Sequence, residues 1–382
     1  MSEYQYYEFQ ALDTPLSSEQ MADLRAYSSR ARITPASFVN EYNWGRFKGN
    51  ETQWMEEYFD AYLYLANWGT HFLEFRVPKE LLANEAASYW VGDSLTYRST
   101  ESHAILSFHS ECEDGEWEEG DGWLAALIPL RADIMDGDYR CLYLAWLMAA
   151  QDGRLPDDTE EPLVPAGLGT LSAPLESLVD FLRINEDLLV AAAEQSAEIA
   201  GQWMTDKQAA AWVATLPVSE KDAILVSLLK GQDPHLGSKL RRRALREIHA
   251  ANGSAEMERG RRTVAEIMVR AEVLGKERRE REVRQHARKQ AERAHKEAKQ
   301  REERLKSIVG KEESLWKEAE ELIATKQPQK YGQALALLLD LRDAAALVGQ
   351  EDGFEARMKA LHTKHARKYA LAERLRKAGL AE

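Results

Sequence analysis

Histidine, cysteine and aspartate at short spacings are the residues with which this sequence could bind metals or transfer protons. His103, His109 and Cys112 lie in one short region, and the two histidines would share one face of a strand. Imidazole and thiolate groups are preferred zinc ligands. This spacing matches no established ligand pattern, so we expect exposed hairpin residues here. His362 and His365 are three residues apart on a predicted helix, but the lysines and arginines around them disfavour a cation.

Three aspartates, Asp133, Asp136 and Asp138, surround the turn IMDGDYR. Paired carboxylates can hold magnesium or act as acid and base. Gly137 favours a simple turn whose aspartates cap the next helix. The segment GLGT at 167–170 lacks the length and the lysine of a phosphate-binding loop, and no GxSxG or HExxH motif occurs. We therefore predict no catalytic residue, no metal and no cofactor, and keep an enzyme with a divergent N-terminal site as an alternative.

The most highly charged helical pattern in the chain is GKERREREVRQHARKQAERAHKEAKQREERLK, residues 275–306. Residues 240–306 contain 21 Lys and Arg against 12 Asp and Glu, a balance that attracts phosphates. A nucleic-acid-associated subunit binding through residues 241–306 is therefore one alternative, and its guanidinium groups would be those of Arg241, Arg242, Arg243, Arg278, Arg281, Arg284 and Arg288. The interleaved acids would repel the same phosphates, and no aromatic ring is present there for stacking on bases.

The same segment also suits a helix that its own charges stabilise in water. Five acid–base pairs are spaced i,i+4 with the acid first, and each contributes about 0.2–0.5 kcal/mol. These pairs are Glu277–Arg281, Glu280–Arg284, Glu292–Lys296, Glu297–Arg301 and Glu302–Lys306. Ala287, Ala291, Ala294 and Ala298 follow a 4-3 spacing, which predicts a narrow coiled-coil seam for a protein partner or for self-association. We favour this spacer or coiled-coil arm over the phosphate-binding interpretation.

The loop ECEDGEWEEGDG, residues 111–122, is the most acidic loop of the sequence. Such a surface could bind a basic partner, with Trp117 and Trp123 as interface anchors, or dock on the basic helix of the same chain. A hydrated loop of a soluble domain is the simpler interpretation.

Composition separates the chain into two parts. Of 382 residues, the first 165 carry a net charge of −19 and 26 of the 33 Phe, Trp and Tyr, whereas the remainder carries +5. Two cysteines are too few for a disulfide framework. The sequence contains no run of about 18 apolar residues, so we expect no membrane-spanning helix. The first residues show no secretory pattern, so we expect a cytoplasmic protein without membrane contact.

The hydrophobic patterns predict an α+β N-terminal domain followed by an all-α region. The order strand, helix, two strands, helix, strand suits a ferredoxin-like unit, with the second helix over 51–69 and the last strand over 71–78. From residue 171 every pattern is helical. The expected parts are an acidic α+β domain 1–152, a linker 153–170, a helical domain 171–253, a long charged arm 254–326 and a C-terminal helical segment 327–382. An unbroken arm of roughly 70 residues would be on the order of 100 Å long.

Two segments carry a resemblance to known proteins: LPVSEKDAILVSLLKG with LRRRAL, and the C-terminal stretch that begins KYGQALALLLDLRDAAALVG. Both resemble helical segments that accompany bacterial SWIM-type zinc-finger proteins. The CxC and CxH pattern of that zinc finger is absent, so the resemblance implies no metal ligand here. The C-terminal stretch also resembles tetratricopeptide-type helix pairs, in which Tyr331, Ala334 and Leu338 would pack between helices.

These patterns together predict a non-catalytic adaptor or structural subunit of a bacterial multi-protein assembly. The resemblance implies a defence or conflict system as its setting. The charged helix would serve as a spacer or coiled coil, and the compact ends would bind protein partners.

Overall fold

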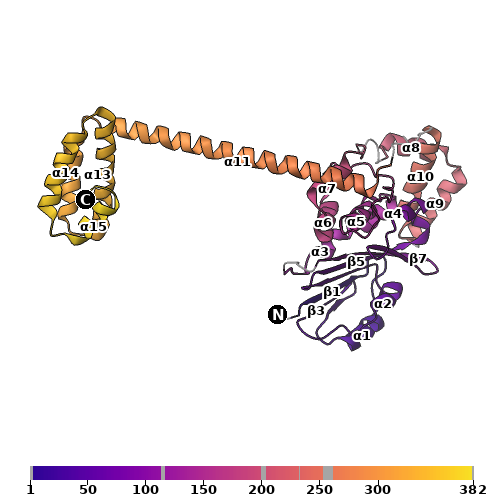
Figure 1. The fold of residues 1–382 in the computed structure, drawn as a ribbon. Coiled ribbons are helices and arrows are strands. Elements are labelled where there is room, and N and C mark those ends of the chain that lie inside the picture. The colour runs from indigo at the N-terminus through magenta and orange to yellow at the C-terminus, as the bar shows by residue number, and fades with distance from the viewer. Residues whose placement is uncertain (1–2, 113–116, 199–203, 232, 253–260, 381–382) are drawn as a thin grey trace. The chain divides into compact units, whose positions relative to one another are not determined.

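A computed structural model describes residues 3–112, 117–198, 204–231, 233–252 and 261–380 (Figure 1). The expected start of the long arm near residue 254 lies outside the described residues. The chain divides into two compact units, residues 1–278 and 279–382. Each unit has its own hydrophobic core. No helix within the described ranges is long and apolar enough to cross a membrane.

The first unit contains a seven-stranded antiparallel sheet with the strand order β2-β3-β1-β4-β5-β7-β6. The strands are β1 (Gln5–Gln10), β2 (Arg32–Thr34), β3 (Ser37–Tyr42), β4 (Ala61–Ala66), β5 (Thr70–Pro78), β6 (Leu95–Ser99) and β7 (His103–Glu111). The predicted α+β N-terminal domain followed by helices is therefore confirmed, as is the hairpin β6–β7.

Alternating side chains give the sheet two apolar faces. On one face Phe9 and Phe38 pack against α1 (Ser18–Tyr27) and α2 (Glu51–Glu57). Helix α1 begins with a capping box, in which Ser17 and Gln20 exchange side-chain to backbone hydrogen bonds of 3.1 and 2.8 Å.

The predicted helix over residues 51–69 is wrong. The helix ends at Glu57, and AYLYLA forms β4 between β1 and β5. Leu63 and Leu65 point to one face of the sheet and Tyr62 and Tyr64 to the other. Pairing along both edges of this segment outweighs its helical spacing of apolar residues.

Helices cover the second face of the sheet. Leu73, Phe75 and Leu106 share a core with the buried faces of these helices. The helices are η1 (Lys79–Leu81), η2 (Asn84–Tyr89), α3 (Trp123–Leu127), α4 (Pro129–Asp136), α5 (Arg140–Gln151), α6 (Ala173–Leu182) and α7 (Glu186–Ala193). Almost all of α5 is buried, as its apolar sequence RCLYLAWLMAAQ predicts.

A small helical group follows in the same unit. It comprises α8 (Asp206–Thr215), α9 (Val218–Lys230) and α10 (Leu236–Asn252). Among the described residues, the buried part of its core consists of Trp212, Leu216 and Ala244. Such a small core leaves much apolar surface of these helices uncovered.

Helix α11 (Val264–Ile308) begins in the first core. Val264, Ile267 and Ala271 are buried there. Residues 279–304 are all exposed. The helix has 45 residues and ends at Ile308 rather than near residue 326, because Gly310 adopts φ 87° and forms a turn before α12.

The second unit packs four helices on the end of α11. They are α12 (Glu312–Ala324), α13 (Pro328–Val348), α14 (Glu351–His365) and α15 (Tyr369–Lys377). Tyr331, Ala334 and Leu338 lie in the core between them, together with Leu305 and Ile308 of α11.

Candidate functional site

A pocket of about 460 Å³ lies between the α4–α5 turn and α10. Its walls come from four separated segments of the first unit, and they combine carboxylates, guanidinium groups, tyrosines and aliphatic side chains. The lining residues are Ala83, Glu85, Tyr89, Asp133, Asp136, Gly137, Asp138, Tyr139, Leu163, Pro165, Ala166, Arg241, Arg242, Leu245 and Arg246. A volume of this size suits a small molecule.

The turn at Gly137 gathers the acids of this pocket. Gly137 has φ 91° and ends α4, and the backbone N–H of Asp138 donates to Asp133 O at 2.8 Å. Asp138 accepts hydrogen bonds of 2.6 and 3.0 Å from the Arg140 guanidinium, so it is neutralised. The sequence predicted the turn, but it did not predict that α10 would cover it.

Asp133 is the carboxyl group whose surroundings favour its charged form least. Burial and the nearby charges of Asp138 and Asp136 raise the pKa of Asp133 to about 6. Among the described residues no hydrogen bond to its carboxyl oxygens is present. It is thus a proton acceptor near neutral pH that lines a cavity.

Arginines of α10 close the opposite wall. Arg241 forms an ion pair with Asp136, and Arg242 donates to Leu81 O and, at 2.9 Å, to the Tyr139 hydroxyl. These contacts hold α10 against α4 and η1. The guanidinium groups of Arg241 and Arg242, which the nucleic-acid alternative requires for phosphate binding, are therefore engaged by groups of the chain itself.

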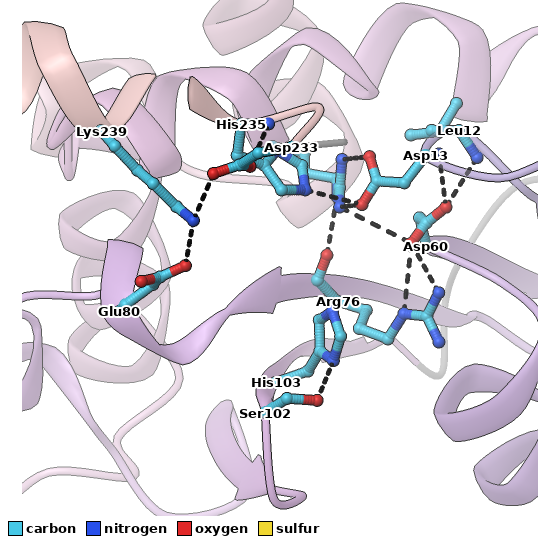
Figure 2. A network of polar contacts seen from close by, with 11 residues as sticks. Leu12, Asp13, Asp60, Arg76, Glu80, Ser102, His103, Asp233, His235 and Lys239 are labelled. Atoms are coloured by element: carbon cyan, nitrogen blue, oxygen red, sulfur yellow. Dashed lines mark hydrogen bonds and ion pairs between the residues drawn. The ribbon is translucent and has the colours of Figure 1, made fainter. Parts of the chain in front are cut away.

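Figure 2 shows a polar network that holds the start of α10 to the sheet domain. Arg131 is buried and donates to Asp13 at 2.9 Å and to the backbone oxygen of Arg76 at 2.6 Å. Arg76 donates to the buried Asp60 at 2.8 Å, and Asp60 also accepts two backbone N–H groups. His235, just before α10, donates from Nε2 to Asp13 at 3.0 Å.

Lys239 of α10 forms an ion pair with Glu80 of η1 and, at 2.7 Å, with Asp233 just before α10 (Figure 2). Burial alone would raise the pKa of Asp13, but hydrogen bonds and positive charge from Arg131 outweigh it and lower that pKa. The network therefore depends on charged partners.

The other predicted phosphate-binding arginines also contact acids of the chain. Arg243 pairs with Glu220 and, at 2.9 Å, with Glu247. Arg278 contacts Asp187 at 2.8 Å. On the exposed part of α11, the partners are Glu280 for Arg284 at 3.0 Å and Glu292 for Arg288 at 2.9 Å, and Arg281 is exposed with an interaction of its own.

Of the predicted i,i+4 pairs, Glu280–Arg284 and Glu302–Lys306 are present, and Glu277 and Arg281 each make an interaction as well. Arg301 instead pairs with Asp343 of α13, and Glu292 pairs with Arg288. The predicted seam of Ala287, Ala291, Ala294 and Ala298 lies on the exposed part of the helix.

The two predicted tryptophan anchors differ in environment. Trp117 is exposed, with its ring 5.6 Å from that of Tyr4. Trp123 begins α3 and packs its ring 5.4 Å from that of Phe181. Residues 113–116 of the acidic loop lie outside the described residues.

The histidines considered as metal ligands are spread out. His103 and His109 are six residues apart on β7, which is about 20 Å along a strand. His103 contacts Ser102 at 2.8 Å, and burial and the charge of Arg76 lower its pKa. The described residues contain no group of three His, Cys, Asp or Glu that could hold a metal ion.

His362 lines a groove of about 900 Å³ in the second unit, while burial and lysine charges lower the pKa of His365. The apolar lining of that groove comes from Ala346, Phe354, Met358 and Leu380.

Helix α9 is the surface that sequence reasoning missed. It has no buried residue. Five of its large apolar side chains are 48–86 % exposed, those of Val218, Leu225, Val226, Leu228 and Leu229. The signal was present: six of the seven residues 223–229 are apolar, more than one helix face can bury.

Comparison of the chain with protein-family models, with curated proteins and with solved structures finds no match.

Proposed function

We propose that this protein is a non-catalytic adaptor of a bacterial multi-protein assembly, in which α9 is a docking surface for another protein. The observation that carries the proposal is the apolar surface of α9, on which Leu229 is 86 % exposed. Contiguous apolar surface of this kind marks sites of protein–protein contact.

The occupant of this surface that we propose is an apolar helix of a different protein. Val218, Leu225 and Leu229 are spaced seven and four residues apart, so they form one stripe along the helix. A stripe of this form accepts a helix by ridge-and-groove packing. A net charge of −14 opposes the approach of a second copy of this chain, which makes a heterologous partner the better fit.

Helix α11 would serve the adaptor as a spacer. Its residues 279–304 are all exposed, and their ion pairs run along the helix or to α13. The groove lined by Phe354, Met358 and Leu380 would receive a second partner. This arrangement agrees with the resemblance of the C-terminal helices to tetratricopeptide-type pairs.

We also infer that β1, α1, β2, β3, α2 and β4 form a ferredoxin-like unit. The strand order β2-β3-β1-β4 and the antiparallel pairing of its neighbours support this. Strands β5, β7 and β6 would extend that unit. The cytoplasm is the compartment we propose.

The contacts of the arginines weigh against nucleic-acid binding as the main role. Arg241, Arg243 and Arg278 are all paired with carboxylates. A gel-shift series at increasing salt tests this, since phosphate binding would appear at low salt and weaken steeply as salt rises.

The adaptor proposal is tested with the full chain carrying Leu225→Glu and Leu229→Glu. Both side chains are more than half exposed, so the fold should change in stability by only about 0.5 kcal/mol. The matched control is Val283→Glu, which places the same new side chain at an isolated exposed valine of α11. Each protein is cross-linked in cells of the source organism, and its partners are identified by mass spectrometry.

The expected result is a protein that cross-links to the wild type and to the control but not to the α9 double variant. Recovery of the same proteins by all three chains would remove α9 as the docking surface. Light scattering tests self-association through α9. A dimer formed by the wild type but not by the double variant would show that the partner is a second copy of this chain.

A further inference from the structure

The pocket between α4 and α10 has a use that the adaptor role does not explain. It is a cavity of about 460 Å³ built from residues 83–89, 133–139, 163–166 and 241–246. Tyr89 and Tyr139 contribute aromatic rings, and Leu163 and Leu245 contribute aliphatic surface. Such walls suit a ligand with an alkyl chain.

Two of the aspartates of the pocket are neutralised by arginines. Asp136 pairs with Arg241, and Asp138 pairs with Arg140. Arg242 is engaged by a backbone oxygen and by the Tyr139 hydroxyl.

After this pairing two carboxylate positions of the pocket remain without a hydrogen-bond donor in the part of the chain that the structure describes, those of Asp133 and of the Asp136 Oδ1 atom. The Asp133 carboxyl lines the cavity, and no described residue donates a hydrogen bond to it. The buried Oδ1 atom of Asp136 also lacks a hydrogen-bond partner among the described residues. Glu85 adds a further carboxylate on the exposed side. A ligand that complements these two carboxylate positions brings hydrogen-bond donors and positive charge to them.

We infer that this pocket binds a small organic cation, a primary ammonium or guanidinium group on a short aliphatic chain, with the cationic group at Asp133. The tyrosine rings provide electron-rich faces for the cation, and the aliphatic walls cover its chain. Arg246, exposed on the α10 side of the pocket, would meet a carboxylate at the other end of a zwitterionic ligand. The basic amino acids and their decarboxylated amines belong to this class.

The test measures binding to the full chain by titration calorimetry with four probes: L-arginine, L-lysine, agmatine and cadaverine. The inference expects at least one of them to bind at millimolar concentration or below. Comparing L-arginine with agmatine isolates the carboxylate, and Arg246→Ala should weaken only the amino acid. A peptide with one internal arginine forms a fifth arm, and its binding in place of the free probes would identify a protein side chain as the source of the cation.

Two variants locate the site in different ways. Asp133→Asn removes the charge and should weaken binding about tenfold or more. Leu245→Trp fills the cavity without changing any charge and should weaken binding to a similar extent, with thermal denaturation confirming that the variant is folded. The matched control Asp158→Asn removes an exposed aspartate outside the pocket and should leave the affinity unchanged.

Absence of binding by every probe, or an Asp133→Asn affinity within about twofold of the wild type, would overturn the inference. Equal weakening in Asp158→Asn would overturn it as well, because the attraction would then be that of an acidic protein for any cation. None of these results bears on α9, so the adaptor proposal is tested separately.

Discussion

Single buried charges decide how the helical part of the first unit is attached to the sheet. The Arg131 side chain is 4 % exposed and contacts Asp13, and it lies 3.6 Å from the Asp60 carboxylate, which is 1 % exposed. Carboxylates in such positions are tolerated only while a cation neutralises them.

Replacing Arg131 with methionine should therefore lower the free energy of unfolding by about 3–5 kcal/mol, because Asp13 would lose its bidentate partner and Asp60 would keep only one of its two arginines. Urea denaturation followed by tryptophan fluorescence measures this. Arg154→Met is the matched control, since Arg154 lies 3.7 Å from Asp152 in a solvent-exposed pair. This substitution should change the free energy of unfolding by less than about 1 kcal/mol. Similar losses in the two variants would show that the network has no special role.

The lowered pKa of Asp13 predicts the direction in which pH changes stability. The unfolded chain takes up this proton near the ordinary value of about 3.9, before the folded chain does. The contribution of Asp13 is thus complete above that value and is lost as pH falls through the lower folded pKa.

Urea midpoints measured from pH 7 down to about pH 3 should therefore converge for the wild type and Asp13→Asn at the acid end. The control Asp158→Asn should run parallel to the wild type throughout. A constant difference between wild type and Asp13→Asn would mean that the Asp13 charge does not stabilise the fold.

Among the elements, α11 is the one whose middle has no tertiary packing to stabilise it. Residues 279–304 are exposed. The ion pairs Glu280–Arg284 and Arg288–Glu292 each join two side chains that lie one helical turn apart. Isolated helices longer than about 15 residues can form in water if such pairs and good helix formers support them.

A synthetic peptide of residues 279–304 should accordingly be substantially helical by circular dichroism at low salt, and less so near 1 M salt, because screening weakens the pairs. The control peptide carries Glu280→Gln and Glu292→Gln and should lose helicity at low salt but respond little to added salt. A wild-type peptide without helical signal would show that the two ends of α11 impose its structure.

Elements also show what could be predicted from sequence. The α1 capping box, strand β5 and the start of α13 at Pro328 follow from signals within a few residues. Strand β4 could not be found in this way, because its state depends on pairing with β1 and β5. The spacing of Trp54, Met55 and Tyr58 matched a helix, and the continuation beyond Glu57 was decided by partners distant in the chain.

The candidate pocket could not be predicted from the sequence, for a related reason. The sequence drew attention to Asp133, Asp136 and Asp138, but a turn alone is no cavity. Arg241 and Arg242, which line the opposite wall, are about 100 residues away in the chain, and the sequence presented them only in the nucleic-acid alternative. Only the packing of α10 on α4 shows that these groups share one site.

At the scale of the whole molecule, the chain has two units with separate cores. Leu338 is fully buried in the second and Leu106 in the first. Replacing either leucine with alanine should lower the free energy of unfolding of its own unit by about 2–5 kcal/mol.

Hydrogen exchange followed by mass spectrometry should localise each loss. Leu338→Ala is expected to speed exchange in α12–α15 and to leave the sheet unchanged, and Leu106→Ala is expected to do the reverse. Faster exchange across both units in either variant would show that the units unfold as one.

The exposed leucines of α9 should also affect the abundance of this protein in the cell. Chaperones and proteases recognise solvent-facing aliphatic surface as a sign of unfinished folding. Copies that outnumber the binding partner would be the ones removed, so the abundance of this chain should follow that of its partner.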